Sequence, residues 1–508
     1  MKILNRTEVI ELKVGKLQGY INEGISIFKG IPFAEPPIGE LRLRAPILKN
    51  SWDGILESFN YKPVAPQTPP YRHDFPPPPQ SEADCLNLNI WSPGCDENMR
   101  PVMFWIHGGA HRTGSGRLMD GKVLSRRGDI VLVSINYRLS MLGYPYLPGV
   151  PANIGQLDQI AALRWVHDNI EAFGGDPNNV TIFGESAGGT SVCALMAMPK
   201  AKGLFHRAIC QSGGVTPIGL KLSERKKTTE LVLEELNLTL DDVDKLRNLP
   251  VENIIEAMTK ASVKAKIALG FKPYIDGENL PKHPIKAIEE GFAKDIELII
   301  GTNLEEWRFW RAFEPKFEEY EPSVFKRRIE DILKSYGIKE NMTEDLIKIY
   351  KKSRYENNMS TNLAEIFEAC KTDSAFRFPS ITFAEAQSRH QENTYMYLFK
   401  WKTPYQNGRF GAMHALDVPF VFGSFLEDYL FIFPKKTPET EELSNKMSDY
   451  WASFARTGIP NPRNILKWPS YKKSSRKTMI FDNNTEIIED PLNLEREAWD
   501  EMKIWSGI

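Results

Sequence analysis

The 508-residue sequence predicts an α/β fold with a large, mostly parallel central sheet flanked by helices. Short apolar segments rich in β-branched residues alternate with segments of helical periodicity between about residues 100 and 215. Strands that alternate with helices imply parallel pairing, because each helical crossover returns the chain along one face of the sheet. The composition, 42% hydrophobic and 26% charged residues, is typical of a globular protein.

The expected elements follow in chain order. Residues 102–106, 130–136 and 180–183 are apolar runs that predict strands, and residues 156–173 carry apolar side chains at helical spacing. A helix is expected to begin near Ala187. Further strands are expected at residues 298–300, 394–401 and 479–482, and charged helical patterns cover 223–246 and 325–350. We therefore expect a single domain over residues 1–508, with helical insertions at about 217–292 and 310–390.

The charge and the cysteine content restrict the partners and the cellular location that can be expected. The net charge is −2, from 64 basic and 66 acidic residues, which argues against a nucleic-acid partner. The five cysteines are scattered without metal-site spacing, which indicates thiols in a cytoplasmic protein. Residues 1–19 lack the apolar run of a signal peptide, and no membrane span is expected. We expect a monomer or small homo-oligomer. The proline-rich stretch 69–79 is expected to form a surface loop.

A nucleophile motif follows the strand expected at 180–183. Residues 184–188 read Gly-Glu-Ser-Ala-Gly, which matches the G-x-S-x-G nucleophile elbow. The glycines suit a tight strand-to-helix turn in which side chains at the flanking positions would clash. The following helix directs its N-terminal N–H groups at a developing oxyanion. Ser186 is therefore the candidate nucleophile.

Residues 107–110, His-Gly-Gly-Ala, end the strand expected at 102–106. This segment is similar to the HGGG-type loop that supplies oxyanion-hole N–H groups in esterases and lipases. Such donors stabilise the tetrahedral intermediate of acyl transfer.

A base must accept the serine proton, and the sequence has eight histidines. His414 follows a late strand, in the chain order Ser, acid, His that this fold class uses. The remaining histidines lie in the oxyanion loop or beside it, in a helix, near a strand start or in polar loops: His73, His107, His111, His167, His206, His283 and His390.

An acid must orient the imidazole of the base. Glu306 follows the strand expected at 298–300, at the strand end where sites in open α/β sheets assemble. Glu305 is adjacent, and spacing alone does not decide between the two carboxylates.

Long ordered motifs across the chain resemble the type-B carboxylesterase family, in the style of its bacterial p-nitrobenzyl-esterase-like members. The matching segments are residues 28–34, 36–39, 84–89, 153–155, 173–177, 183–189, 454–458 and 468–471. The resemblance implies an α/β-hydrolase fold with helical insertions over the active site. It also implies a serine carboxylesterase that hydrolyses short-to-medium acyl or aryl esters through a covalent acyl-enzyme, without metal or cofactor.

The resemblance also implies residue roles. It assigns the catalytic acid to Glu306, with Glu305 in the preceding acidic position, and supports His414 as base. The remaining residues implied for the site comprise the oxyanion-hole donors Gly109, Ala110 and Ala187, the neighbouring Gly108 and Glu185, the buried Ser212, and Asp417 in place of a family glutamate.

The sequence departs from the family pattern at several positions. His111 stands where an aromatic residue is usual, and Trp307 replaces a glycine after the acid, so both are expected to line or reshape the pocket. Cys85 has no partner for a family disulfide. Ala83 replaces a glutamate, so Arg42 is expected to lack an ion-pair partner. No tryptophan occurs at 65–85, which argues against a choline ester as substrate.

Alternative functions remain open at this level. A non-catalytic interaction protein of the family would lack the triad, whereas all its residues are present here. A lactone, a carbamate, a polyester or a lipid substrate would use the same residues, because the fold does not fix the substrate.

Overall fold

The computed structural model describes residues 5–68, 78–215, 221–266, 269–428 and 430–503. Most of the proline-rich stretch 69–79 lies outside the described residues. The chain forms two compact units. Unit 1 comprises Met1–Ile209, Gly219–Pro284 and Trp451–Ile459, and unit 2 comprises Cys210–Ile218, Ile285–Tyr450 and Pro460–Ile508.

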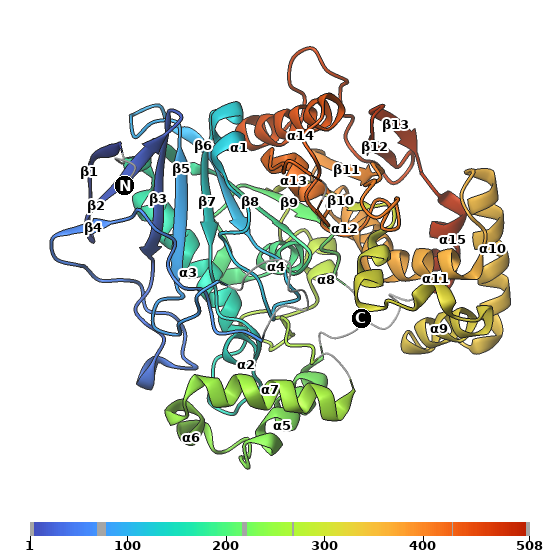
Figure 1. The fold of residues 1–508 in the computed structure, drawn as a ribbon, viewed down its shortest axis with the longest axis horizontal. Helices are drawn as coiled ribbons and strands as arrows, with labels where there is room; N and C mark the ends of the chain where they lie inside the picture. The colour runs from blue at the N-terminus through green and yellow to red at the C-terminus, as the bar shows by residue number, and fades with distance from the viewer. Residues whose placement is uncertain (1–4, 69–77, 216–220, 267–268, 429, 504–508) are drawn as a thin grey trace. The chain divides into compact units, whose positions relative to one another are not determined.

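A mixed sheet forms the centre of unit 1 (Figure 1). Its strands are β1 (Arg6–Leu12), β2 (Gly15–Asn22), β3 (Ile25–Pro32), β4 (Ile55–Glu57), β5 (Asn87–Ser92), β6 (Arg100–Ile106), β7 (Val131–Ile135) and β8 (Gly175–Glu185). The order is β1-β2-β3-β5-β7-β6-β8, with β4 beside β2. β6 pairs in parallel with both β7 and β8, whereas β5 is antiparallel to β7. Every residue of β6 and β7 is buried, as expected for strands covered on both faces.

Helices cover this sheet and extend beyond it in unit 1. They are α1 (Lys122–Gly128), α2 (Ser140–Gly143), α3 (Ile154–Asn169), α4 (Ala187–Leu195), α5 (Leu222–Glu235), α6 (Val243–Asn248) and α7 (Val251–Ala265). The expected strands at 102–106, 130–136 and 180–183 and the helix at 156–173 are confirmed, with the last turn of that helix a 3₁₀ turn, η2 (Ile170–Phe173).

The helical pattern at 223–246 folds as two helices, α5 and α6. Asn237 between them adopts a left-handed φ of 54°, and the Leu238 N–H bonds back to the Leu233 carbonyl, which ends α5. Helices α5 to α7 pack through a buried apolar cluster that includes Met141 of α2 and Val232 of α5.

Unit 2 contains a second group of strands and most of the remaining helices. The strands are β10 (Glu297–Asn303), β11 (Thr394–Phe399), β12 (Lys477–Phe481) and β13 (Glu486–Glu489). The residues of β9 (Arg207–Gln211) up to Ile209 belong to unit 1, and those from Cys210 belong to unit 2. β10, β11 and β12 pair in parallel in that order, and β13 is antiparallel to β12. The strands expected at 298–300, 394–401 and 479–482 are therefore present, and the predicted α/β class is confirmed.

Most of the remaining helices belong to unit 2, several of them in the range 310–390. They are α8 (Pro284–Glu289), α9 (Pro322–Ser335), α10 (Thr343–Glu356), α11 (Leu363–Thr372), α12 (Phe378–Gln387), α13 (Asp417–Phe422), α14 (Pro438–Thr457) and α15 (Asn493–Glu501). The first residue of α8 and the part of α14 from Trp451 onward belong to unit 1. The pattern at 325–350 divides into α9 and α10, because Gly337 takes φ 72° and the Ile338 N–H bonds to the Leu333 carbonyl. α9, α10 and α11 share a buried apolar cluster centred on Ile329, Tyr350 and Ile366.

Two expectations about polar groups have different outcomes. All five cysteines, each within the described ranges, occur as thiols, as expected. The expectation that Arg42 lacks an ion-pair partner is wrong. The carboxylate of Glu82, one residue before Ala83, accepts hydrogen bonds from Nε of Arg42 at 2.6 Å and from its Nη2. The ion-pair partner therefore comes from residue 82, because the backbone there places the Glu82 carboxylate within reach of the Arg42 guanidinium.

In the part of the chain that the structure describes, no helix combines the length and the apolar character needed to cross a bilayer.

Candidate active site

The elbow at Ser186 joins β8 to α4 in unit 1. Ser186 caps α4 with φ 57° and ψ −120°, a strained conformation that is typical of functional positions. A Cβ at Gly188 would lie 2.0 Å from the Ile106 carbonyl oxygen, and one at Gly184 would lie 2.6 Å from the Gly188 carbonyl carbon. Both positions therefore require glycine. The backbone segments approach each other here as closely as the motif predicted.

The expected oxyanion loop lies against this elbow. A Cβ at Gly108 would lie 2.8 Å from Oε2 of Glu185 and 3.1 Å from Cβ of Ser186. Gly109 and Ala110 follow with φ of 105° and 57°. Ala187 is the first residue of α4, whose N-terminal N–H groups are unused within a helix. Unit 1 thus brings the serine and the three expected donor residues into one region.

His111 connects the expected oxyanion loop to α4. Its Nε2 lies 3.1 Å from Oγ of Ser191, and it makes a hydrogen bond with the backbone of Ala187. Ser191 Oγ also accepts from Nε2 of Gln156 at 3.0 Å and Nε2 of Gln159 at 3.1 Å. A hydroxyl has two acceptor positions and one hydrogen, so Ser191 donates that hydrogen to His111. His111 is therefore a neutral side chain that connects the loop to α4.

Burial sets the charge state of both histidines in this loop. Burial, together with the nearby positive charges of Lys272 and Arg225, lowers the pKa of His111 to about 3. Burial lowers the pKa of His107 to about 4, although its Nδ1 lies 2.8 Å from the Gly108 carbonyl oxygen. Both rings are consequently uncharged at neutral pH.

Glu306 and His414 form a buried pair in unit 2. Oε2 of Glu306 lies 2.6 Å from Nδ1 of His414, and the two side chains are 0% and 6% exposed. The other carboxylate oxygen of Glu306 accepts from the Asn303 N–H at 2.7 Å. This geometry fixes Nδ1–H of His414 as donor and leaves Nε2 as the basic nitrogen. Glu305 makes no such bond and contacts the backbone of Ala412 instead.

Aromatic rings that the sequence reasoning missed surround His414. The rings of Phe376, Trp310 and Phe309 have centroids 4.8, 5.3 and 5.7 Å from the imidazole. Phe309 and Trp310 belong to a 3₁₀ helix, η4 (Glu306–Phe313), whose first residue is the expected acid. The aromatic-rich stretch 307–313 was the sequence feature that could have indicated Phe309 and Trp310 as neighbours of the site. Trp307 stacks on Trp310, with the two ring centroids 4.3 Å apart.

Asp417 lies in a buried polar network of unit 2. It accepts hydrogen bonds from Tyr397 Oη at 2.7 Å, Gln211 Nε2 at 2.9 Å and Asn303 Nδ2 at 3.4 Å. Burial raises its pKa despite these donors. Asn303 also donates to the Met413 carbonyl at 2.7 Å, so the network supports the segment that carries His414.

Ser212, the other serine that the resemblance placed near the site, is completely buried with φ 49°. Its N–H donates to the Gly301 carbonyl of β10 at 2.8 Å. Among the described residues, its hydroxyl has no hydrogen-bond partner. The structure therefore shows a buried serine beside the strand that leads to the acid.

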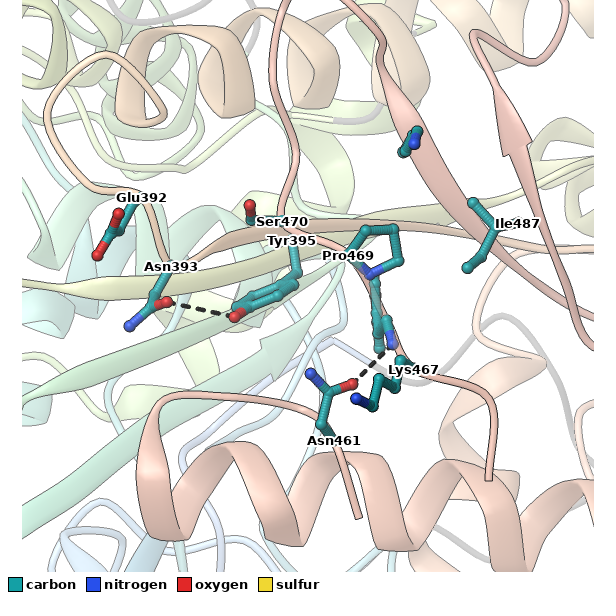
Figure 2. Close-up of a pocket in the computed structure, with 10 residues that line it drawn as sticks. Glu392, Asn393, Tyr395, Asn461, Lys467, Pro469, Ser470 and Ile487 are labelled. Carbon is teal, nitrogen blue, oxygen red and sulfur yellow. Dashed lines mark hydrogen bonds between the residues drawn. The ribbon is translucent and has the colours of Figure 1, made fainter. Parts of the chain in front are cut away.

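A cavity of about 510 Å³ in unit 2 has a different character (Figure 2). Its lining includes Asn393, Tyr395 and Asn461, and the Tyr395 hydroxyl donates to Asn393 Oδ1 at 3.3 Å. None of the described residues that line it is a predicted nucleophile, base, acid or oxyanion donor. This cavity therefore gives no support to hydrolytic chemistry.

Comparisons with known proteins give one consistent relationship. The model of the family described as "Carboxylesterase family" matches residues 6–499. Para-nitrobenzyl esterase of Bacillus subtilis is 35% identical over 96% of this chain and 98% of its own. Phenmedipham hydrolase of Pseudarthrobacter oxydans is 32% identical over 94% and 95%. The solved structure of a Geobacillus stearothermophilus carboxylesterase superposes with a TM-score of 0.85 at 36% identity, over 97% of this chain and all of that one.

Proposed function

The chain belongs to the carboxylesterase family of carboxylic ester hydrolases, and from that premise we propose that it acts through Ser186, His414 and Glu306. The observation that carries this proposal is the buried hydrogen bond of 2.6 Å between Glu306 and His414. A histidine held in this way by a carboxylate is the base that a serine nucleophile requires.

The proposed reaction has two stages. His414 Nε2 accepts the proton of Ser186 Oγ as that oxygen attacks the ester carbonyl carbon. The tetrahedral oxyanion accepts hydrogen bonds from the N–H groups of Gly109, Ala110 and Ala187. His414 then gives its proton to the leaving alkoxide, and an acyl-enzyme remains on Ser186.

Deacylation repeats these steps with water as nucleophile. His414 accepts a proton from water, the hydroxide attacks the acyl carbonyl, and the proton returns to Ser186 as the carboxylic acid leaves. Glu306 orients the imidazole and stabilises the imidazolium in both stages. Besides the ester and water, every group in this proposed reaction is a side chain or a backbone N–H of the chain.

We propose short-to-medium acyl or aryl esters as substrates. The half-buried aromatic rings beside His414 offer apolar surface for such groups, and apolar lining with a few polar groups is typical of small-molecule sites. A cytoplasmic location is also proposed, supported by five cysteines that occur as thiols.

The experiment compares hydrolysis of p-nitrophenyl esters, from acetate to palmitate, by the wild type, Ser186→Ala and Ser51→Ala. Ser51 is an exposed serine outside the site and serves as the matched control. We expect turnover on short chains by the wild type and the control, and none by a folded Ser186→Ala. Retained turnover in Ser186→Ala would overturn the nucleophile.

A further inference from the structure

Two successive glutamates at the end of β10 contact the histidine segment in different ways. Glu306 bonds to the imidazole of His414, whereas Glu305 bonds to the backbone of Ala412. The Ala412 N–H donates to Oε2 of Glu305 at 2.9 Å, and the Glu305 N–H donates to the Ala412 carbonyl at 3.0 Å. The side chain and the backbone of Glu305 therefore bond to the N–H and the carbonyl of Ala412, which lies two residues before His414.

The segment is shaped to receive this carboxylate. Gly411 has φ 54°, and a Cβ there would lie 2.0 Å from Oε2 of Glu305. Only glycine permits the backbone to approach the carboxylate so closely in this conformation. The His414 N–H in turn donates to the Glu306 carbonyl at 3.3 Å, so the two chain segments are joined on both sides of Met413.

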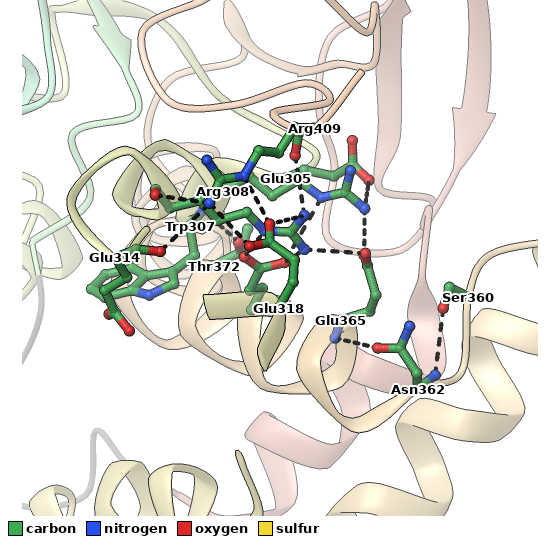
Figure 3. Close-up of polar contacts among 12 residues, drawn as sticks. Glu305, Trp307, Arg308, Glu314, Glu318, Ser360, Asn362, Glu365, Thr372 and Arg409 are labelled. Atoms are coloured by element: carbon green, nitrogen blue, oxygen red, sulfur yellow. Dashed lines mark hydrogen bonds and ion pairs between the residues drawn. The ribbon is translucent and has the colours of Figure 1, made fainter. Parts of the chain in front are cut away.

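A buried ion-pair network holds the Glu305 carboxylate in place (Figure 3). Oε1 of Glu305 lies 2.9 Å from Nη2 of Arg308 and 3.5 Å from Nζ of Lys402, and Glu305 is only 6% exposed. Arg308 also pairs with Glu365 of α11, and its Nε lies 3.8 Å from Glu368 of the same helix. The carboxylate is thereby connected to α11.

A second arginine completes the network. Arg311 donates to both carboxylate oxygens of Glu368 at 2.6 Å and lies 3.2 Å from Glu365. Burial raises the pKa of Glu365, but the charges of Arg308 and Arg311 outweigh it and lower the pKa below its ordinary value. Burial raises the pKa of Glu368 to about 7. Through Arg308, the network joins the carboxylate of Glu305 to Glu365 and Glu368 of α11.

We propose that Glu305 is a positioning residue, whose carboxylate fixes the backbone at Ala412 so that the His414 imidazole stays on Glu306. The inference rests on the proposed function of His414 as base. Glu305 acts through the histidine segment and touches neither the ester nor the reacting atoms.

The experiment measures kcat, KM and the pH profile of kcat/KM for p-nitrophenyl acetate with Glu305→Gln. Glutamine keeps the length of the side chain but loses the ion pairs with Arg308 and Lys402 that hold the carboxylate against the Ala412 N–H. We expect kcat to fall about 10- to 100-fold, because small misplacements of catalytic groups cost this much, with KM within about twofold of the wild type as expected for an effect confined to the transition state. The acid limb should move to lower pH, because a histidine less well seated on Glu306 gains less stabilisation of its imidazolium.

Glu314→Gln is the matched control, because it removes a half-buried ion pair of unit 2, the 2.9 Å contact of the Glu314 side chain with Arg328. The bonds of Glu314 with Arg311 and Arg409 involve its backbone, which the substitution keeps. The control should keep the wild-type kcat and acid limb. An unchanged kcat in Glu305→Gln, or a reduced kcat with an unmoved acid limb, would overturn the inference. If Glu305→Gln does not fold, Arg308→Gln carries the same test with the same outcomes.

Glu306→Gln separates this inference from the proposed function. An inactive Glu306→Gln beside a Glu305→Gln that behaves like the control would refute only the positioning role. A fully active Glu306→Gln would refute the proposed function itself.

Discussion

His111 lies in the expected oxyanion loop, at a position where the family resemblance leads us to expect a different aromatic side chain. It is buried, adopts φ 55° and bonds to Ser191 and the backbone of Ala187 on α4. An aromatic hydrocarbon ring would fill the same space without these bonds. The side chain therefore adds polar contacts between the loop and the helix that carries the third expected donor.

The low pKa of His111 predicts a dependence of stability on pH. Its folded-state pKa is about 3, below the ordinary 6.5, so the unfolded chain binds the proton first as the pH falls. The stabilisation is complete above pH 6.5 and is lost as the pH falls toward 3. We expect the Tm of His111→Phe to lie below that of the wild type at pH 7 and to approach it by pH 4. Scanning calorimetry across this range measures the difference, and a constant gap would contradict the assignment.

The two neighbouring glutamates predict a second residue-level result. Glu306→Gln should reduce kcat by about 10⁴, because an amide holds the histidine in the wrong tautomer and cannot stabilise its imidazolium. Glu305→Gln should cost far less, since Glu305 acts only on the backbone at Ala412. Steady-state kinetics of both variants on p-nitrophenyl acetate makes the comparison. The reverse order would show that the acid is Glu305.

At the scale of elements, Arg42 connects two segments of unit 1. Its guanidinium pairs with Glu82 and donates to the carbonyls of Leu246 and Arg247 in the last turn of α6, at 3.2 and 2.8 Å. Cations are favourable at a helix C-terminus, where carbonyl groups lack intrahelical partners. The pair with Glu82 balances a buried charge that would otherwise face carbonyl oxygens alone.

Removing one partner of this pair should therefore destabilise the protein. We expect Glu82→Ala to cost about 3 kcal/mol, the range observed when a buried ion pair loses one charge. Glu40→Ala, which removes an exposed pair with Arg44 at 3.7 Å, should cost less than about 1 kcal/mol. Urea unfolding followed by circular dichroism compares the two variants. Equal midpoints would mean that the buried pair contributes no more than the surface one.

At the scale of the molecule, each compact unit is assembled from separate stretches of chain. Unit 1 takes its last residues from Trp451–Ile459, and unit 2 takes its first from Cys210–Ile218. Neither unit corresponds to a continuous piece of sequence that could fold on its own. We therefore propose that residues 1–508 behave as one folding domain.

This organisation predicts one cooperative unfolding transition. Scanning calorimetry should give a single peak whose calorimetric and van't Hoff enthalpies agree. Limited proteolysis should likewise yield no fragment that remains folded alone. Two resolved peaks, or a stable fragment matching one unit, would show that the units fold independently.

Local sequence was sufficient for the features that depend on a few neighbouring residues. The strands and helices between 100 and 200 were predictable, because the period of apolar residues determines which element can bury them. Long helical patterns were predicted less well. The breaks after α5 and α9 depend on left-handed residues at Asn237 and Gly337, which a periodicity spread over the whole segment hides.

By itself, the sequence determined the fold class, the family and the elbow at Ser186. The elbow follows from sterics within five residues, where Gly184 and Gly188 leave no room for a Cβ. Tertiary structure alone decided that Glu82 pairs with Arg42, that Trp310 and Phe376 face His414, and that Glu305 holds Ala412. Each of these contacts joins residues far apart in the chain, and their distance in space depends on the path of the backbone between them.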